Sequence, residues 1–444
     1  MKDILTSEDI LTFQKAYDGR EANIAIQNAV VKNGPASCAV DHMRTRPLVE
    51  NYSVDLDAGK VCNQKQSGRC WMFAAYNVFR LEVMRKLNLK NMELSQAYPL
   101  FFDKLEKCNF FLENILATLD EKTSSRLLSH LLKDPIGDGG QWNMFVGLTK
   151  KYGVCPKEMM PESFSSSRTR DMDGLITLKL RKDAAILRKE HIGGKDLAAL
   201  RGLKESMLKE IYGILVTCLG KPPVSFTYET RDKDGRYVRI EDITPLEFYD
   251  RYVGLNLDDY VSLINAPTSD KPFHRSFTVK FLGNLVGEKV RYLNLPIEEL
   301  KRCALSQLQD GEVVWFGSDV GKDLLRPEGL LSLGVYAYDS LFDCDFSMTK
   351  EERLDYGESL MTHAMVLTGV NVRDDGKADR WKVENSWGEE SGYKGFYAMD
   401  DAWFDQFVYQ VVVNKKYLTP EELAEYDSDP IELEPWDPMG SLAL

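Results

Sequence analysis

The segment 64–73, which reads Gln-Lys-Gln-Ser-Gly-Arg-Cys-Trp-Met-Phe, holds the residues most suited to chemistry. Cys70 falls where a helix is expected to begin, because residues 71–87 are apolar at helical spacing and lack Gly and Pro. A helix N-terminus carries about half a positive charge, which favours the nucleophilic thiolate form of cysteine. Gln64 lies six residues upstream and can offer its side-chain N–H to the oxyanion that forms when a thiolate attacks a carbonyl.

A thiolate nucleophile needs a proton partner and a third group that orients this partner. Among the five histidines, His363 stands out because it begins an apolar strand and the run Glu-Asn-Ser-Trp-Gly follows at 384–388. The Asn385 carbonyl can accept a hydrogen bond from one imidazole N–H and hold the ring towards the thiolate. Trp387 can shield that hydrogen bond from water. Cys70, His363 and Asn385 are therefore a candidate nucleophile, acid–base and orienting residue.

The elements that must position these residues are distributed unevenly along the chain. Helical patterns dominate the first part, whereas after about residue 277 the apolar pattern changes to period two. Helices early and strands late indicate an α+β architecture rather than a βαβ repeat. The segments expected to form strands are 276–280, 289–293, 313–316, 365–372 and 381–384.

Two further segments differ from their surroundings. Between about 168 and 210 basic residues outnumber acidic ones and apolar residues follow helical spacing, which predicts a helical insertion. Its basic face is typical of a solvated surface, with contact to nucleic acid or to another subunit as alternatives. Near the other end, Thr419-Pro420-Glu421-Glu422 predicts a helix start, and the prolines that follow predict an extended arm on the protein surface.

Composition excludes several classes of protein. The 444 residues are 43% hydrophobic and 28% charged, as in a globular protein with two or three domains or one enlarged core with insertions. The net charge of −13 argues against a protein built to coat nucleic acid. The charged N-terminal segment lacks a signal-peptide core, and no apolar stretch approaches the ~20 residues of a membrane span. Eight cysteines without a Cys-x-x-Cys pair argue against structural zinc and indicate a reducing, cytoplasmic environment.

The Cys segment, the His strand and the Asn-Ser-Trp-Gly run together resemble the papain superfamily of cysteine peptidases. This resemblance implies a helical left subdomain with a central catalytic helix and a β-barrel-like right subdomain. Secreted members carry a disulfide-bonded Cys where this chain has Ser67. His363 also follows Cys70 at about twice the usual ~130–150 residues, which leaves room for the insertion.

The insertion, the segment 64–73 and the final run Pro-Trp-Asp-Pro-Met-Gly-Ser-Leu-Ala-Leu resemble the bleomycin hydrolase/aminopeptidase C subfamily. The resemblance covers about residues 33–444 and implies a cytosolic homohexamer whose active sites face an internal cavity. It also implies that Gly139 and Gly140 line the unprimed side of the cleft and that the C-terminal arm lies in that cleft. The regions expected on this basis are a lead-in and helical catalytic subdomain with the nucleophile (1–167), a mainly helical insertion for oligomerisation (168–275), a β-rich catalytic subdomain with His and Asn (276–418) and the arm (419–444).

The arm suggests an exopeptidase on physical grounds as well. The carboxylate of Leu444, held near the nucleophile, can pair with the α-ammonium group of a substrate and block any residue beyond it. Trp387 is expected to contribute to the substrate-binding side of the same cleft. The sequence leaves open whether Leu444 stays or is trimmed to leave Ala443 as this clamp.

The expected function is therefore a cysteine aminopeptidase of broad specificity that acts on peptides with a free α-amine. It requires no metal and no organic cofactor, and no membrane partner is expected. One alternative is an endopeptidase of the same fold whose arm does not restrict access. Others are an acyltransferase or amidase that uses a Cys–His pair, and a module that binds nucleic acid through the basic insertion.

Overall fold

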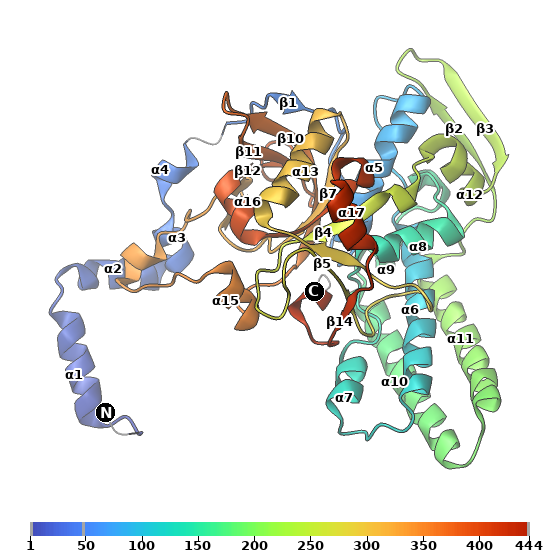
Figure 1. Cartoon of the computed structure of the whole chain (residues 1–444), viewed down its shortest axis with the longest axis horizontal. Coiled ribbons are helices and arrows are strands. Elements are labelled where there is room, and N and C mark those ends of the chain that lie inside the picture. Colours follow the sequence, from blue (N-terminus) through green and yellow to red (C-terminus); the bar gives the residue numbers. More distant parts are fainter. Residues whose placement is uncertain (1–2, 47–48, 442–444) are drawn as a thin grey trace.

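The structure, a computed structural model, describes residues 3–46 and 49–441 of the chain. A helical part and a large sheet pack against each other, and a group of short helices extends from this body (Figure 1). The α+β class expected from the sequence is therefore confirmed. No helix in the described ranges combines the length and the apolar character needed to cross a membrane.

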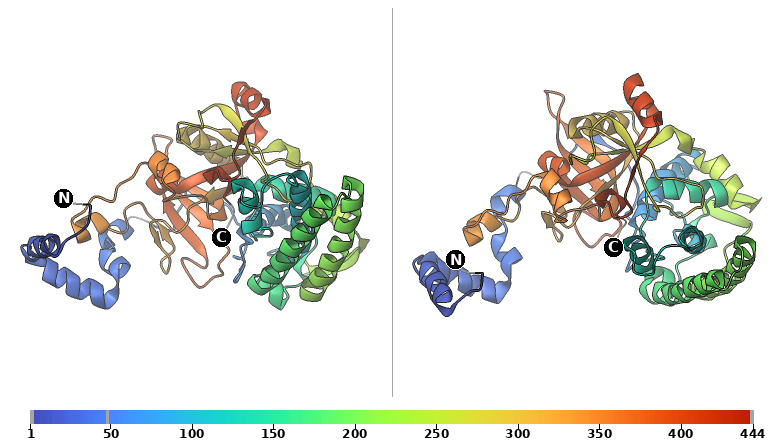
Figure 2. Two further views of the ribbon diagram at one scale, coloured as in Figure 1. Left: turned by 90° about the horizontal axis from the view of Figure 1, so that it is seen from below. Right: turned by 60° about the horizontal axis from the view of Figure 1, so that its bottom comes forward.

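The four N-terminal helices lie away from the body in all three views (Figures 1 and 2). α1 begins at a capping box between Thr6 and Asp9, but neither α1 nor α2 buries a residue. α3 lies against α14, and Asp41 and Arg44 also form hydrogen bonds with carbonyls of Val335 and Leu333 in the later chain. The helices are α1 (Ser7–Asp18), α2 (Ala22–Asn33), α3 (Pro35–Ala39) and α4 (His42–Thr45).

The helical part is organised around α5, the helix that begins at Cys70 as expected. α5 is buried along most of its length because it is apolar on nearly all sides. α8 packs against α5 and α6 packs against α8, and the rings of Trp71, Phe79 and Phe145 meet in their shared core. The elements are α5 (Cys70–Lys86), α6 (Ala97–Ala117), α7 (Arg126–Lys133), α8 (Trp142–Tyr152), the 3-10 turn η1 (Lys157–Met159) and α9 (Phe164–Ser167).

The range 168–275 begins with two long helices, α10 and α11, that pack against each other and against α6. The range also contains a two-stranded hairpin, several short helical segments, the strand β4 and the beginning of β5. The division of the chain into four regions stays a proposal. The elements are α10 (Arg170–Ile192), α11 (Leu197–Leu219), β2 (Phe226–Arg231), β3 (Tyr237–Ile243), α12 (Pro245–Phe248), η2 (Tyr249–Val253), η3 (Leu257–Asp259), β4 (Tyr260–Ile264) and β5 (Arg275–Val279).

The main sheet combines twelve strands of the described chain in the order β14-β5-β6-β4-β13-β7-β10-β11-β12-β9-β8, with β1 paired to β10. β10 lies between β7 and β11, antiparallel to both. The remaining elements are β1 (Val54–Asp55), β6 (Tyr292–Asn294), α13 (Ile297–Gln309), β7 (Val314–Ser318), β8 (Leu324–Leu325), β9 (Leu330–Leu331), α14 (Tyr338–Phe342), α15 (Lys350–Asp355), β10 (His363–Val372), β11 (Ala378–Glu384), β12 (Phe396–Asp400), α16 (Asp401–Phe407), β13 (Val408–Asn414) and η4 (Lys415–Tyr417).

The five segments expected to form strands correspond to β5, β6, β7, β10 and β11, although β6 begins only at Tyr292. β4, β12 and β13 were not expected. α13 and α16 cover the sheet and share a second core with it, built around Trp381, Trp403 and Phe404. α5 packs against β10 from the helical part, so the two halves of the body meet at this helix and this strand.

The last segment confirms the expected helix start and adds a strand. Thr419 and Glu422 form a capping box at the beginning of α17 (Pro420–Asp427). The chain then continues as β14 (Ile431–Leu433), which pairs in parallel with β5 at the edge of the main sheet, and as the turn η5 (Pro438–Gly440). The sheet edge therefore holds the segment that follows α17.

Candidate active site

Cys70 is the first residue of α5 and lies at the junction of the two halves. It is 1% exposed, and the backbone N–H of Ala364 in β10 donates to its sulfur. The first N–H groups of a helix have no intrahelical acceptor, and those of Cys70 and Trp71 act to lower the pKa of this thiol. Cys70 therefore lies in the first turn of α5 and against Ala364, the residue that follows His363.

His363 is the first residue of β10, and Asn385 directly follows β11. Because β10 and β11 are antiparallel neighbours, the beginning of one strand lies beside the end of the other. His363 Nε2 and Asn385 Oδ1 are 2.8 Å apart, within hydrogen-bonding distance, which leaves Nδ1 as the ring nitrogen available to Cys70. The Asn385 oxygen also accepts from the N–H of Ser386. The structure therefore joins His363 to Asn385 and places Cys70 against Ala364, the residue that follows His363.

Trp387 covers the ring of His363. The two ring centroids are 4.9 Å apart with an interplanar angle of 36°. The guanidinium of Arg326 also lies over the Trp387 ring, 4.5 Å from its centroid. His363 and Asn385 are both buried, so the hydrogen bond between them is protected from water.

Burial opposes a charge on either reacting group when each is taken alone. It raises the pKa of the Cys70 thiol to about 11, although N–H groups of Ala364 and Trp71 act in the other direction. Burial lowers the pKa of His363 to about 4, against the opposing effect of its hydrogen bond with Asn385. We expect the thiolate to form by proton transfer from Cys70 to His363, because this step leaves the net charge of the buried pair unchanged.

This coupling predicts an unusual pH dependence for alkylation of Cys70. A thiolate formed by proton transfer to His363 is a fixed fraction of the net-neutral pair between the two pKa values, whereas one formed by proton loss to solvent increases tenfold per pH unit. We expect the rate with iodoacetamide, followed by mass spectrometry of the Cys70 peptide, to be flat between pH 5 and pH 8. An ordinary thiol reacts about tenfold faster for each pH unit in this range. The exposed Cys344 is the internal reference, and a tenfold slope at Cys70 would contradict the coupling.

Gln64 is held in place by the sheet half of the molecule. Its N–H donates to the Ser386 carbonyl at 2.8 Å, and its Oε1 accepts from the Ser386 hydroxyl at 2.5 Å. Its Nε2 donates to the Ser67 carbonyl at 2.6 Å, which uses one of its two hydrogens. The sequence did not predict that Ser386 holds Gln64, since the only sequence signal of Ser386 is its place beside Asn385.

Gly139 and Gly140 lie in a loop against Trp71, the neighbour of the nucleophile. A Cβ on Gly140 would stand 2.5 Å from the Trp71 ring, so only glycine fits there. The indole N–H of Trp71 donates to the carbonyl of Asp138 at 2.8 Å. Lys107 donates to the carbonyls of Gly137 and Gly139, both at 2.7 Å, and so fixes the loop from the other side.

The C-terminal arm ends, as far as the structure describes it, beside this glycine loop. Gln141 follows Gly140 and donates through Nε2 to the carbonyl of Ser441 at 3.1 Å. Earlier in the arm, Tyr292 donates to the carbonyl of Met439, and Lys271 pairs with Asp437 at 2.9 Å. Leu444, the expected clamp, lies outside the described residues.

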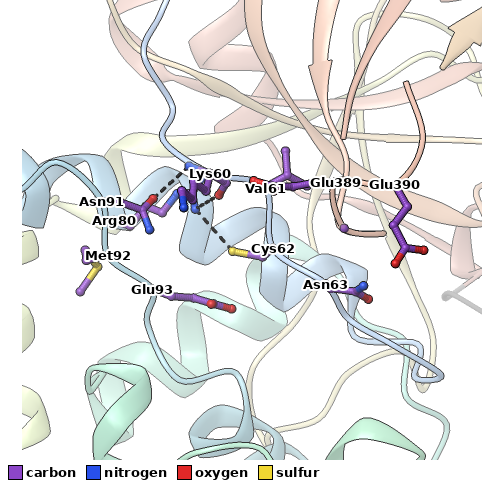
Figure 3. Close-up of a pocket in the computed structure, with 11 residues that line it drawn as sticks. Lys60, Val61, Cys62, Asn63, Arg80, Asn91, Met92, Glu93, Glu389 and Glu390 are labelled. Atoms are coloured by element: carbon purple, nitrogen blue, oxygen red, sulfur yellow. Dashed lines mark hydrogen bonds between the residues drawn. The ribbon is translucent and has the colours of Figure 1, made fainter. Parts of the chain in front are cut away.

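A cavity of about 470 Å³ lies behind the Cys segment rather than at the reacting groups (Figure 3). Arg80 of α5 points at the chain 60–62 in this view and donates to the Lys60 carbonyl and to the Cys62 sulfur. Arg80 also pairs at 2.5 Å with Glu384, the residue before Asn385. This buried pair joins α5 to the last residue of β11, directly before Asn385, a role with no signal in the sequence.

No group of three or more His, Cys, Asp or Glu side chains within the described ranges is arranged to hold a metal ion. The chemistry that the described residues can perform is nucleophilic attack by sulfur on a carbonyl, with proton transfer through an imidazole.

Comparison with known proteins gives a consistent set of relatives. The profile of the Peptidase C1-like family matches residues 4–440. Aminopeptidase C of Listeria monocytogenes is 48% identical over 445 residues, which covers 100% of each chain. Human bleomycin hydrolase is 43% identical over 403 residues, or 89% of each chain. A crystal structure of PepW from Lactobacillus rhamnosis matches with a TM-score of 0.98 at 51% identity and full coverage of both chains.

Proposed function

The chain belongs to the Peptidase C1-like family and is a papain-like cysteine peptidase, and from this premise we propose that it removes residues from the free N-terminus of peptides. The observation that carries the chemistry is the constellation of Cys70 under the Ala364 N–H with His363 hydrogen-bonded to Asn385 at 2.8 Å. The name of the relative from Listeria monocytogenes, aminopeptidase C, supports an aminopeptidase within this family.

In the proposed mechanism Cys70 transfers its proton to His363 and attacks the carbonyl carbon of the first peptide bond. The backbone N–H of Cys70 and the second Nε2 hydrogen of Gln64 stabilise the oxyanion, a contribution of about 3–4 kcal/mol for one such donor. His363 gives its proton to the leaving amine, and a thioester remains on Cys70. His363 then takes a proton from water, which attacks the thioester and releases the acid product.

Asn385 and Trp387 act on His363 rather than on the substrate in this proposal. Asn385 holds the ring so that Nδ1 faces Cys70, and Trp387 keeps water from the hydrogen bond between them. Gly139 and Gly140 are proposed to bind the substrate backbone, because the absence of side chains lets another chain approach closely. No metal and no organic cofactor takes part in any of these steps.

Restriction to the N-terminus is proposed to come from the arm. The bond from Gln141 to the Ser441 carbonyl supports this, because it brings the arm to the residue that follows the proposed substrate-binding glycines. Residues after Ser441 are then expected to continue into the cleft, where a carboxylate such as that of Leu444 would pair with the α-ammonium group of the substrate. An endopeptidase of the same fold is the competing proposal.

A pair of fluorogenic peptides with one sequence, one with a free α-amine and one acetylated, tests the proposed function. We expect release from the free-amine peptide only, in the presence of reductant, and its loss after treatment with a thiol alkylator. Alkylator-sensitive cleavage of the acetylated peptide would keep the mechanism at Cys70 and replace the aminopeptidase by the endopeptidase.

The chain is also proposed to assemble as a homohexamer. Support comes from α1 and α2, which bury nothing and expose apolar side chains, among them Phe13, Ile24 and Val31. Such a surface is typical of one that another subunit covers. Sedimentation velocity measures the mass of the assembly against the 50.6 kDa of one chain.

A further inference from the structure

Five ionisable side chains lie together beneath the glycine loop. Lys104 of α6 pairs with Asp138 at 2.7 Å and with Asp173 of α10 at 2.9 Å. One turn away, Lys107 pairs with Asp103 at 2.8 Å and donates to two carbonyls of the loop. Lys104 and Asp103 are fully buried, and the other three are largely buried. The cluster therefore joins α6, the glycine loop and the first turn of α10.

Asp138 ties this cluster to both sides of the nucleophile. Its carboxylate accepts from the N–H of Gly68, two residues before Cys70, at 2.7 Å, and from the Thr169 hydroxyl at 2.5 Å. Its carbonyl accepts from the indole of Trp71, the residue after Cys70. A shift of Asp138 would therefore move the Cys segment and the glycine loop relative to each other.

The charges of the cluster balance only if one carboxyl group keeps its proton. Two ammonium groups face three carboxyl groups, and an extra buried charge is costly. Although burial acts against it, Lys104, Thr169 and Gly68 hold the pKa of Asp138 well below its usual range. Burial and the neighbouring carboxylate of Asp138 raise the pKa of Asp173 to about 7, against the attraction of Lys104. Burial also raises the pKa of Asp103, but Lys107 and Asn284 favour its ionised form, so the proton of the cluster is assigned to Asp173 below about pH 7.

We propose that Asp138 is a positioning residue that holds the Cys segment against the glycine loop, and that Asp173 supports it only while it carries a proton. Protonated Asp173 donates to Asp138. Ionised Asp173 repels Asp138 and competes with it for Lys104. This inference rests on the proposed function, because it takes Gly139 and Gly140 as substrate-binding residues.

The charged groups around Asp173 determine the direction of the effect. Lys104 attracts it and Asp138 repels it, while Asp103 and Lys107 neutralise each other one turn along α6. Raising the pH through about 7 therefore removes a hydrogen bond from Asp138 and adds a like charge beside it. The glycine loop should loosen, so that KM for a free-amine peptide increases while kcat changes little.

The test compares the wild-type protein with Asp173→Asn, whose amide donates to Asp138 at every pH. The α-amine of the substrate titrates equally for both proteins, so the ratio of their KM values isolates Asp173. We expect the KM of the wild-type protein to equal that of Asp173→Asn at pH 6. At pH 8.5 the wild-type KM should be roughly fivefold higher, as a coupling somewhat below one pKa unit gives. Asp138→Asn should increase KM at both values of pH and remove the dependence.

A matched control and a second readout complete the experiment. Asp183→Asn neutralises another buried carboxylate of α10, which pairs with Lys179. The KM of this variant should equal that of the wild-type protein at both values of pH. Amide hydrogen exchange of the segments 66–72 and 137–141 needs no substrate. Faster exchange in the wild-type protein than in Asp173→Asn at pH 8.5, but not at pH 6, is expected even if no peptide is cleaved.

The outcomes separate the two proposals. A wild-type protein that leaves the free-amine peptide intact contradicts the proposed function, and the exchange data still decide the role of Asp173. A KM ratio and an exchange difference that stay constant from pH 6 to pH 8.5 overturn the inference about Asp138 and Asp173. Should Asp173→Asn fail to fold, Asp138→Asn with the same two readouts decides the question.

Discussion

Replacement of Cys70 by Ala should reduce hydrolysis of a free-amine peptide on the order of a millionfold, because the sulfur forms the covalent intermediate and no neighbouring group can replace it. The comparable loss known for triad nucleophiles leaves only the background supplied by oxyanion stabilisation and binding. The rate is measured with the fluorogenic free-amine peptide in the presence of reductant.

The fold should survive this change. Cys70 begins α5 without a side-chain cap, and Ala removes one buried sulfur from a helix start that is otherwise fixed by Arg69 and its bidentate partner Glu162. Thermal unfolding followed by circular dichroism checks this. Cys344→Ala removes an exposed thiol and is the control that should keep full activity. A Cys70→Ala protein that stays folded and retains even one per cent of the rate is incompatible with the proposed nucleophile.

Deletion of residues 441–444 should change the specificity of the enzyme. It removes the contact of Ser441 with Gln141 and the residues proposed to bind the α-ammonium group. A charge-assisted hydrogen bond contributes about 1.5–3 kcal/mol, so kcat/KM for the free-amine peptide should decrease roughly tenfold to a hundredfold. Internal cleavage of the acetylated peptide should appear at the same time, because the cleft is then open beyond the substrate N-terminus.

The remaining arm should stay in place after this deletion. β14 still pairs with β5, and Arg126 still lies over the Trp436 ring at 3.8 Å. Glu434→Gln is the matched control, since it breaks only the exposed ion pair with Lys280, and such pairs contribute little. If the truncated protein keeps the specificity of the intact one, the arm has no part in selecting the substrate N-terminus.

Local patterns along the sequence were enough to find the reacting residues. The apolar periodicity after Ser67-Gly68 predicted the beginning of α5 at Cys70, and the period-two pattern predicted the strand that starts at His363. The run at 384–388 then supplied an amide of the right type next to a strand end. These signals are local because helix starts and strand ends depend on residues within one or two turns. The order of Cys, His and Asn along the chain then indicated the papain-like family.

The tertiary structure decided what surrounds those residues, because the groups that pair across the site are far apart in the sequence. Arg80 reaches Glu384, Gln64 reaches Ser386, and Asp138 reaches Gly68. No spacing rule connects such residues, since their contact depends on how α5, the glycine loop and β11 pack. β4, β12 and β13 were also missed, although β13 is rich in β-branched residues, and the structure shows each of them paired on both sides.

The ionisation of Cys70 and His363 shows most clearly what depends on local sequence and what depends on the tertiary structure. The sequence by itself indicated a thiolate at Cys70, because a helix N-terminus is a local feature. Burial is not local, and it raises the pKa of that thiol to about 11 and lowers the pKa of His363 to about 4. The sequence therefore determined which residues are of a type that can react, whereas only the packed structure decided how strongly burial opposes a charge on each, because desolvation depends on everything that covers them.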